Sequence, residues 1–321
     1  MFALLLKALH TPLSYESVSD PEPKKGEVVV ALRSAALNHR DVYIRQGLYA
    51  GIRCPVILGS DGAGEYRGRP VIINPGMQWG DNAAFQSKDF HILGMPGNGT
   101  FAEMVTVPKT QIHPKPDHLT WEQAAALPLA GVTAWRVLFR RCACTPGQRV
   151  LISGIGGGAA LMAMQFAIAT RASVWVTSGS DEKIERATAL GAKGGVNYRQ
   201  SEWDKRLRQE AGGFDIIIDA AGGEGFPALV GLCNPGGRIG IFGGTAGKIS
   251  QLSPQVIFWK QISIHGSTMG SPSDFKEMLR LVVRQEVVPV VDSIFSLAEG
   301  NAAFERMEKG EQFGKIVLNT R

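Results

Sequence analysis

The stretch that decides the fold is Arg149-Val-Leu-Ile-Ser-Gly-Ile-Gly-Gly-Gly-Ala-Ala-Leu-Met-Ala-Met-Gln-Phe-Ala, residues 149–167. An apolar strand, a glycine cluster and an apolar helix follow one another directly in it. The glycines permit a tight turn that brings the backbone close to a pyrophosphate, and free N–H groups at the helix start would meet the phosphates. Glycine clusters also occur in turns that bind nothing, so the flanking strand and helix are what favour a dinucleotide site. The cofactor-binding residues expected here are Gly154, Gly156, Gly157, Gly158 and Ala159.

Strands and helices alternate on both sides of this turn. Continuous apolar strands are expected at 150–153, 174–177, 215–219 and 238–242. Such runs are typical of a parallel sheet that helices cover on both faces. A long helical stretch over 121–139 precedes them. The sequence therefore predicts a doubly wound Rossmann domain over residues 118–268.

The remaining chain has a different pattern. Up to residue 117, short β runs alternate with Gly and Pro clusters, which indicates a mostly β domain. Residues 269–321 add two helices and a last strand, too few for a domain of their own, so we expect them to rejoin the first domain.

Composition excludes several functions. A chain of 321 residues suits two domains, and its net charge of +5 comes from Lys and Arg residues that form no run, so no nucleic-acid partner is expected. The short apolar start has neither the length of a membrane span nor the features of a signal peptide. Four cysteines are too few for a disulfide framework and suit a reducing cytoplasm. They are Cys54, Cys142, Cys144 and Cys233.

The choice of dinucleotide depends on the end of the second strand. An NAD site places an acid there, about 20 residues after the glycines, against the ribose hydroxyls. This chain has Thr177-Ser178-Gly179-Ser180 instead. Ser178 could bond a 2′-phosphate and Lys183 could supply charge, so NADPH is favoured. Alternatively, Ser180 only caps a helix and Lys183 is an ordinary solvated residue.

Several further segments carry a family resemblance. They are residues 36–49, 58–64, 98–103, 131–135 and 214–223. Together with the glycine turn, these motifs resemble the medium-chain dehydrogenase/reductase superfamily, in its zinc-independent quinone oxidoreductase branch. The resemblance implies a GroES-like β domain built from both chain ends, an inserted Rossmann domain and an active site in the cleft. Residues 63–70 depart from the family pattern, because they reach the next strand with fewer residues than relatives use, so a shortened hairpin is expected there.

The resemblance also bears on metals. Alcohol dehydrogenases of this superfamily hold a catalytic zinc with two Cys and one His, and those positions read Asn38, Ser60 and Leu129 here. The lobe near residues 76–100, where relatives bind a structural zinc, has no cysteine. We therefore expect no metal site, because thiolate and imidazole ligands are missing. The pairs Cys142 with Cys144 and His113 with His118 lack complementary ligands.

Site residues follow from the same resemblance. It places Asn38, Tyr43 and Tyr49 in the pocket near the nicotinamide, where they are the candidate catalytic donors, although both tyrosines could equally be half-buried packing residues. Loop residues after the later strands are expected beside the cofactor, where glycines allow close approach. The additional cofactor candidates are Thr133, Tyr198, Phe242, Gly243, Gly244, Thr245, Ser267, Thr268 and Lys315.

These observations predict a reductase that passes hydride from NADPH to a quinone or an α,β-unsaturated carbonyl compound. Without zinc no Lewis acid stabilises an alkoxide, whereas a conjugated acceptor needs only hydrogen-bond donors and a proton. The alternatives are an enoyl-CoA-type reductase of the same superfamily and a low-turnover NADPH-binding structural or redox-sensing protein. Relatives pair through a Rossmann sheet edge, so a homodimer or homotetramer through residues 261–264 is expected.

Overall fold

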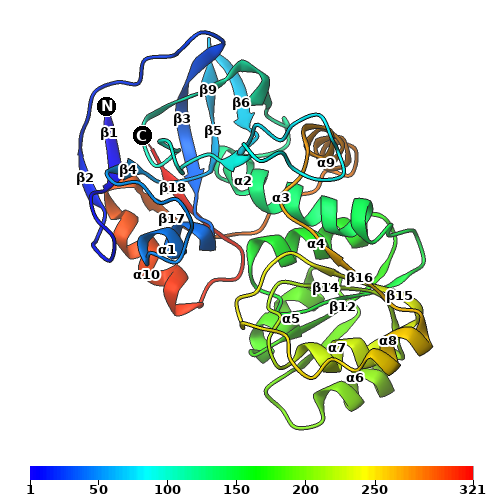
Figure 1. Ribbon diagram of the computed structural model, residues 1–321. Helices are drawn as coiled ribbons and strands as arrows, with labels where there is room; N and C mark the ends of the chain where they lie inside the picture. Colours follow the sequence, from blue (N-terminus) through cyan, green and yellow to red (C-terminus); the bar gives the residue numbers. More distant parts are fainter. Residues whose placement is uncertain (321) are drawn as a thin grey trace. The chain divides into compact units, whose positions relative to one another are not determined.

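The computed structural model describes residues 1–320, which fold into two compact units. Unit 1 combines Met1–Leu129 with the chain from Ser271 onward, and unit 2 is Ala130–Gly270 (Figure 1). An α/β unit is therefore inserted into a unit built from both ends of the chain, as the sequence predicts.

The first boundary between the units differs from the expected one. It lies after Leu129, not after residue 117, because α2 (Trp121–Ala126) packs on the sheet of unit 1. The return to unit 1 begins at Ser271, two residues later than expected. The helical stretch expected over 121–139 is also divided into α2, α3 (Pro128–Trp135) and a π-helical segment, η2 (Arg136–Arg141). Pro128 starts a new helix because proline fits the first turn of a helix but not its interior.

Unit 2 holds a six-stranded, all-parallel sheet in the order β13-β12-β11-β14-β15-β16. The order reverses between β12 and β14, on either side of β11, which is the arrangement at which doubly wound folds bind ligands beyond the carboxyl ends of their strands. The strands are β11 (Arg149–Ile152), β12 (Ser173–Ser178), β13 (Gly194–Asn197), β14 (Phe214–Asp219), β15 (Cys233–Ile241) and β16 (Ser263–Gly266).

Helices cover both faces of this sheet. On one face, Leu151, Ile217 and Ile239 pack with apolar residues of α6, α7 and α8. The residues that alternate with them along the strands lie on the opposite face of the sheet. There Gly240 lies so close to η2 that a side chain at this position would collide with Val137. This burial on both faces explains the continuous apolar strands. The helices are α4 (Gly158–Ala169), α5 (Asp181–Ala189), α6 (Trp203–Ala211), α7 (Phe226–Leu232) and α8 (Pro254–Lys260).

Unit 1 is mostly β structure. Its main sheet has the order β10-β6-β5-β3-β18-β17, with β9 also paired to β3, and smaller sheets join β2-β1-β4 and β7-β8. Its strands are β1 (Phe2–Leu6), β2 (Ser14–Ser17), β3 (Glu27–Ala36), β4 (Val56–Ile57), β5 (Asp61–Tyr66), β6 (Arg69–Ile73), β7 (Gly76–Met77), β8 (His91–Ile92), β9 (Met104–Pro108), β10 (Ile112–Pro114), β17 (Val291–Ser296) and β18 (Lys315–Asn319). Its helices, besides α2, are α1 (His39–Arg45), η1 (Lys109–Gln111), α9 (Pro272–Arg284), η3 (Leu297–Glu299) and α10 (Gly300–Lys309).

One strand pairing positions the site of unit 1. The last strand, β18, runs antiparallel to β3, with Val317 opposite Ala36. The Leu37 N–H donates to the Ile316 carbonyl at 2.9 Å, so the start of β18 lies beside the end of β3. Residues near position 38 therefore meet residues near position 315.

Residues 63–70 form a tight hairpin, at the place where the comparison with the family leads us to expect one. Antiparallel β5 and β6 pair from Ala63 with Ile72 to Tyr66 with Arg69. Arg67 and Gly68 form the turn, both with positive φ, which matches the twist of the flanking strands.

Within residues 1–320, no helix has the length and apolar character that crossing a membrane requires.

Candidate functional site

The glycine-rich turn of unit 2 lies between β11 and α4. Gly154 and Gly156 have φ values of +64° and +137°, which side chains disfavour. A Cβ atom at Gly154 or Gly157 would meet nothing within 4 Å, so the turn is open there. Gly157 precedes α4 and offers no capping side chain, which leaves the first N–H groups of the helix available to a phosphate. All five residues predicted at this turn lie here: Gly154, Gly156, Gly157, Gly158 and Ala159.

A buried carboxylate fixes the turn to the neighbouring loop. Asp219 ends β14 and accepts hydrogen bonds from the Ser153 hydroxyl and, at 2.7 Å, from the Gly222 N–H. It thereby joins the loops that follow β11 and β14. Asp219 was not among the residues predicted from the sequence, although an acid at the end of a buried apolar strand was a visible signal.

Ser178 and Ser180 organise the end of β12. The buried Ser178 hydroxyl donates to the Ile155 carbonyl at 3.4 Å and accepts from the Ser180 N–H at 3.2 Å. Ser180 caps α5 by accepting from the Lys183 N–H at 3.4 Å. The capping alternative for Ser180 is therefore present in the structure, and the Ser178 hydroxyl is engaged by backbone groups.

Three polar side-chain ends lie around this strand end. A Cβ atom at Gly156 would lie 3.4 Å from Lys183 Nζ. A Cβ atom at Gly179 would lie 3.0 Å from the Tyr198 hydroxyl and 2.8 Å from Arg199 Nε. Two cationic groups and a phenol thus flank the turn and the second strand. Arg199 was not predicted from the sequence. It follows β13, whose Asn197 lies opposite Ser178 of β12.

The loop after β15 lies at the same carboxyl edge of the sheet. The Phe242 N–H donates to the Asp219 carbonyl at 3.1 Å, and the Thr245 N–H to the Ala220 carbonyl at 3.4 Å. A side chain at Gly243 would collide with the Ala220 carbonyl, so glycine is required for this close approach. The predicted loop residues Phe242, Gly243, Gly244 and Thr245 therefore form one surface with the loop after β14.

The remaining predicted cofactor residues of unit 2 are placed as follows. The Thr133 hydroxyl is buried and contacts Met269 Sδ at 3.8 Å. The Ser267 N–H donates to the Ile241 carbonyl at 2.8 Å, and its buried hydroxyl has no hydrogen-bond partner among residues 1–320. Thr268 is exposed. Of these three residues, Ser267 is the one whose buried donor is unsatisfied within residues 1–320, so a ligand could use it.

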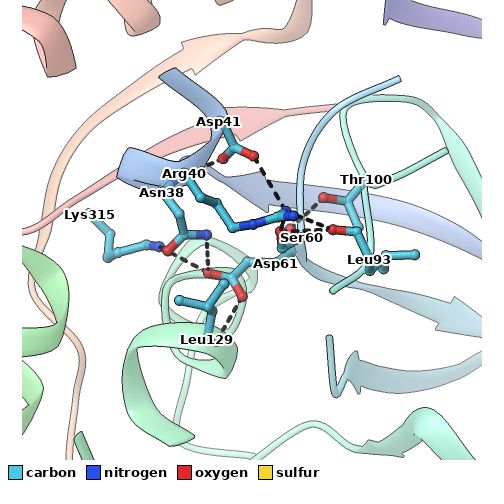
Figure 2. Close-up of polar contacts among 9 residues, drawn as sticks. All are labelled: Asn38, Arg40, Asp41, Ser60, Asp61, Leu93, Thr100, Leu129 and Lys315. Carbon is cyan, nitrogen blue, oxygen red and sulfur yellow. Dashed lines mark hydrogen bonds and ion pairs between the residues drawn. The ribbon is translucent and has the colours of Figure 1, made fainter. Parts of the chain in front are cut away.

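Unit 1 contains a buried ionic centre around Asn38, which Figure 2 shows. Lys315 Nζ donates to Asn38 Oδ1 at 2.6 Å and to Asp61 Oδ2 at 2.9 Å. Asn38 Nδ2 donates to the same Asp61 oxygen at 2.9 Å. The other Asp61 oxygen accepts from the Leu129 N–H at 2.8 Å. Lys315, predicted as a cofactor residue, is thus bound to Asn38, a predicted catalytic residue.

A second buried ion pair lies beside this centre (Figure 2). The Arg40 guanidinium donates to the Ser60 hydroxyl and, at 3.0 Å, to the Leu93 carbonyl. Asp41 Oδ2 accepts from the Asn38 N–H at 2.8 Å, while its Oδ1 lies 4.0 Å from Arg40 and has no hydrogen bond within residues 1–320. Burial raises the pKa of Asp41 to about 6, although Arg40 opposes the shift.

The two predicted tyrosines have different surroundings. Tyr49 is partly exposed, and its ring lies 5.1 Å from the Arg40 guanidinium carbon. Tyr43, on α1, is half-buried, with its ring 6.5 Å from the ring of His39. The contacts of the structure join Tyr49 to Arg40 by a cation–π interaction. They do not join either tyrosine to Asn38 within the described part of the chain.

Two family models match the chain, an alcohol dehydrogenase GroES-like domain over residues 24–117 and a zinc-binding dehydrogenase over residues 158–284. A relative from Leptosphaeria maculans, the zinc-type alcohol dehydrogenase-like protein YogA, is 32% identical over 97% of this chain and 95% of its own length. The chain belongs to the medium-chain dehydrogenase/reductase superfamily. This confirms the predicted family and the predicted fold, a GroES-like unit with an inserted Rossmann unit.

Solved structures of this superfamily align with nearly the whole chain. A crystal structure of an NAD-dependent alcohol dehydrogenase is 35% identical, with a TM-score of 0.94 and 99% of each chain covered. The quinone oxidoreductase from Thermus thermophilus, solved also in complex with NADPH, is 27% identical, with a TM-score of 0.84 over 99% of this chain and 100% of the other. This medium-chain dehydrogenase/reductase is thus an oxidoreductase with a nicotinamide dinucleotide cofactor.

The zinc implied by the matching models does not fit the residues present. At the three ligand positions of the zinc enzymes, this dehydrogenase/reductase offers the Asn38 amide, the Ser60 hydroxyl and the apolar Leu129. The Asn38 oxygen accepts from an ammonium and Ser60 from a guanidinium, so both face cations. Zinc sites in proteins use thiolate, imidazole and carboxylate ligands, and among residues 1–320 no three such side chains converge.

Proposed function

We propose that this protein is an NADPH-dependent reductase that transfers hydride to a quinone or an α,β-unsaturated carbonyl compound without a catalytic zinc. The observation that carries the proposal is the substituted ligand set, in which Asn38 and Ser60 bind buried cations and Leu129 offers no donor. The Rossmann unit binds the cofactor, and the GroES-like unit supplies hydrogen-bond donors to the acceptor.

The preference for NADPH is supported by the charges at the end of β12. Lys183 and Arg199 bring two cationic groups to the turn and the strand end, and the Tyr198 hydroxyl lies beside them. The position at which an NAD site carries an acid is Ser178. The next acid along the chain, Asp181, is held by a hydrogen bond from Asn197 at 3.1 Å. A 2′-phosphate carries negative charge, so charge-assisted bonds from these cations favour NADPH over NADH.

A conjugated acceptor is favoured because the site offers hydrogen-bond donors in place of zinc ligands. Hydride adds to one carbon of a quinone or enone, the π electrons move to the conjugated oxygen, and that oxygen takes a proton from solvent while NADP⁺ is released. The overall reaction with a quinone is quinone + NADPH + H⁺ → hydroquinone + NADP⁺. Hydrogen-bond donors suffice to stabilise the oxygen as it gains charge. Oxidation of a simple alcohol passes through an alkoxide, which is a far stronger base than an enolate or a hydroquinone anion, so it needs stronger stabilisation, such as the Lewis acidity of a metal ion.

Purified protein tests this proposal directly. Oxidation of NADPH and NADH is followed by absorbance with a panel of quinones, enones and enoyl-CoA thioesters, and reduction of NADP⁺ and NAD⁺ with simple alcohols. Metal content is measured in parallel, with and without a chelator. We expect NADPH oxidation with quinones or enones that the chelator does not change. Alcohol oxidation that depends on stoichiometric zinc would refute the proposal.

We also propose that the protein acts in the cytoplasm as a homodimer, which can pair further into a tetramer, through the β16 edge of the Rossmann sheet. β16 pairs with β15 alone among residues 1–320, and Ile264 on it is exposed. On α8, which precedes β16 in the chain, Phe258 and Trp259 are 63% and 84% exposed, an unusual exposure for large apolar side chains. The strand begins at Ser263, not at Gln261 as expected, because Gln261 has a φ of +53° and ends α8. The edge is thus shorter than predicted.

A further inference from the structure

Lys315 connects all three positions at which zinc enzymes of this superfamily carry ligands. It bonds the Asn38 amide directly and Asp61, which follows Ser60 in the chain. Asp61 in turn accepts from the N–H of Leu129. The ammonium is thus a buried positive charge in direct contact with the first of these positions, and it comes from a strand 277 residues away in sequence.

The partners of Asn38 fix the orientation of its amide. An ammonium has only donors, so the group that faces Lys315 is the amide oxygen. A carboxylate has only acceptors, so the group that faces Asp61 is the NH₂. Within residues 1–320, the Asn38 amide therefore keeps one N–H without a partner. Lys315 has three N–H donors and makes two hydrogen bonds, so it also keeps one N–H without a partner.

The side chains of Lys315 and Asn38 are buried but keep a small accessible surface. Lys315 is 4% exposed and Asn38 is 8% exposed, whereas Asp61 is fully buried. In so dry a setting a charged donor acts on a developing negative charge far more strongly than it would in water. Asp61 receives three hydrogen bonds, which keep the carboxylate in place beside the ammonium. The donors are therefore preorganised before any acceptor binds.

We propose that Lys315 is the fixed cation of the acceptor site and that its ammonium and the Asn38 amide donate their remaining N–H groups to the acceptor oxygen. This inference rests on the proposed function and names the groups that perform its electrostatic step. As hydride reaches the acceptor carbon, the π electron pair moves onto the oxygen, which Lys315 and Asn38 stabilise until it takes a proton from water. Asp61 is a positioning residue that holds the ammonium and the amide.

The test compares Lys315→Met with the double variant Asp61→Asn/Lys315→Met. The single variant leaves Asp61 buried without its counter-ion, so it can lose stability for that reason alone. The double variant removes both charges with little change in volume and is expected to fold. Lys309→Met, at an exposed lysine on α10 of the same unit, is the matched control. Thermal melting establishes which variants are folded.

Two measurements are made on each folded variant. The first is the ionisation of bound 4-nitrophenol, whose phenolate imitates a hydroquinone or enolate anion and needs no turnover. We expect wild type and Lys309→Met to lower the pKa of the bound probe by about one unit or more, and both Lys315 variants to abolish the shift. The second is NADPH oxidation, where we expect kcat to fall about 100-fold or more in both Lys315 variants with unchanged affinity for NADPH.

The outcomes separate the possible roles of Lys315. A double variant with the kcat and the probe shift of wild type would show that the ion pair is only structural and would overturn the inference. Weaker NADPH binding with unchanged kcat would make Lys315 a cofactor ligand and would also overturn it. If wild type reduces no quinone or enone, the proposed function fails, and the probe measurement still decides for or against Lys315.

Discussion

Replacing Asp41 by Asn should make the stability of unit 1 respond differently to pH. Asp41 is fully buried, and one of its oxygens accepts the Asn38 N–H at 2.8 Å. Burial raises its pKa from 3.8 to about 6. The folded state therefore holds the proton more tightly than the unfolded chain does, and stability falls as pH rises between these two values. An Asn at this position keeps the acceptor and removes the charge.

The magnitude follows from the shift. A difference of about 2.2 between the two pKa values corresponds to about 3 kcal/mol of unfolding free energy. Wild type loses this stability at neutral pH because the buried Asp41 is ionised there, and the variant does not lose it. About 2 kcal/mol of it develops between about pH 4.5 and about pH 7.5, since the unfolded carboxyl is already mostly ionised at the lower pH. Relative to wild type, Asp41→Asn should therefore gain about 2 kcal/mol of stability across this range.

The assay is urea unfolding at both pH values. Unfolding is monitored by hydrogen exchange of the β3 and β18 amides, so that unit 1 alone is observed. Asp292→Asn is a control of opposite sign. Burial alone would raise the pKa of Asp292, but hydrogen bonds from Arg306 and the Phe313 N–H lower it overall. Its stabilising effect is present above the unfolded pKa and is lost in acid, so that variant should lose stability at neutral pH. An Asp41→Asn difference that stays constant with pH would refute the reasoning.

Four further substitutions test other parts of the structure. Lys183→Ala and Arg199→Ala should each raise KM for NADPH about 10- to 100-fold, because each removes one charge-assisted bond to the 2′-phosphate, and should leave KM for NADH unchanged. Equal effects on both cofactors in steady-state kinetics would contradict the phosphate-binding role. Trp259→Ser should shift the protein toward monomer in sedimentation, whereas an unchanged mass would exclude α8 from the interface. Gly64→Ala should lower the melting temperature by several degrees, because its Cβ would lie 2.2 Å from the Ala31 carbonyl oxygen; unchanged melting would show that the strands shift freely.

The Rossmann unit could be predicted because its signals are local in sequence. The strand, the glycines and the helix occupy one stretch of chain, and Lys183 follows the second strand in the same pattern. Arg199 and Asp219 were missed because each acts across neighbouring strands, and the pairing of those strands is set by tertiary packing. Residue spacing along the chain does not report it.

The ionic centre of unit 1 could not be derived in this way. Asn38 and Lys315 were each selected, one for the acceptor and one for the cofactor, but their contact spans 277 residues. Asp61 was not selected, because an acid after a short strand has many possible roles. The break at Pro128 was missed since a proline within an apolar helical pattern can begin a new helix as well as end an old one.

The antiparallel pairing of β18 with β3 has a consequence for how the chain matures during synthesis. Residues 130–270 of unit 2 are contiguous, so the Rossmann sheet can form while translation continues. Unit 1 lacks the strand between β3 and β17 until residues 315–319 leave the ribosome, and until then Asp61 has no ammonium to neutralise it. The nascent protein thus acquires its complete Rossmann unit first, and unit 1 is complete only after residues 315–319 have been synthesised.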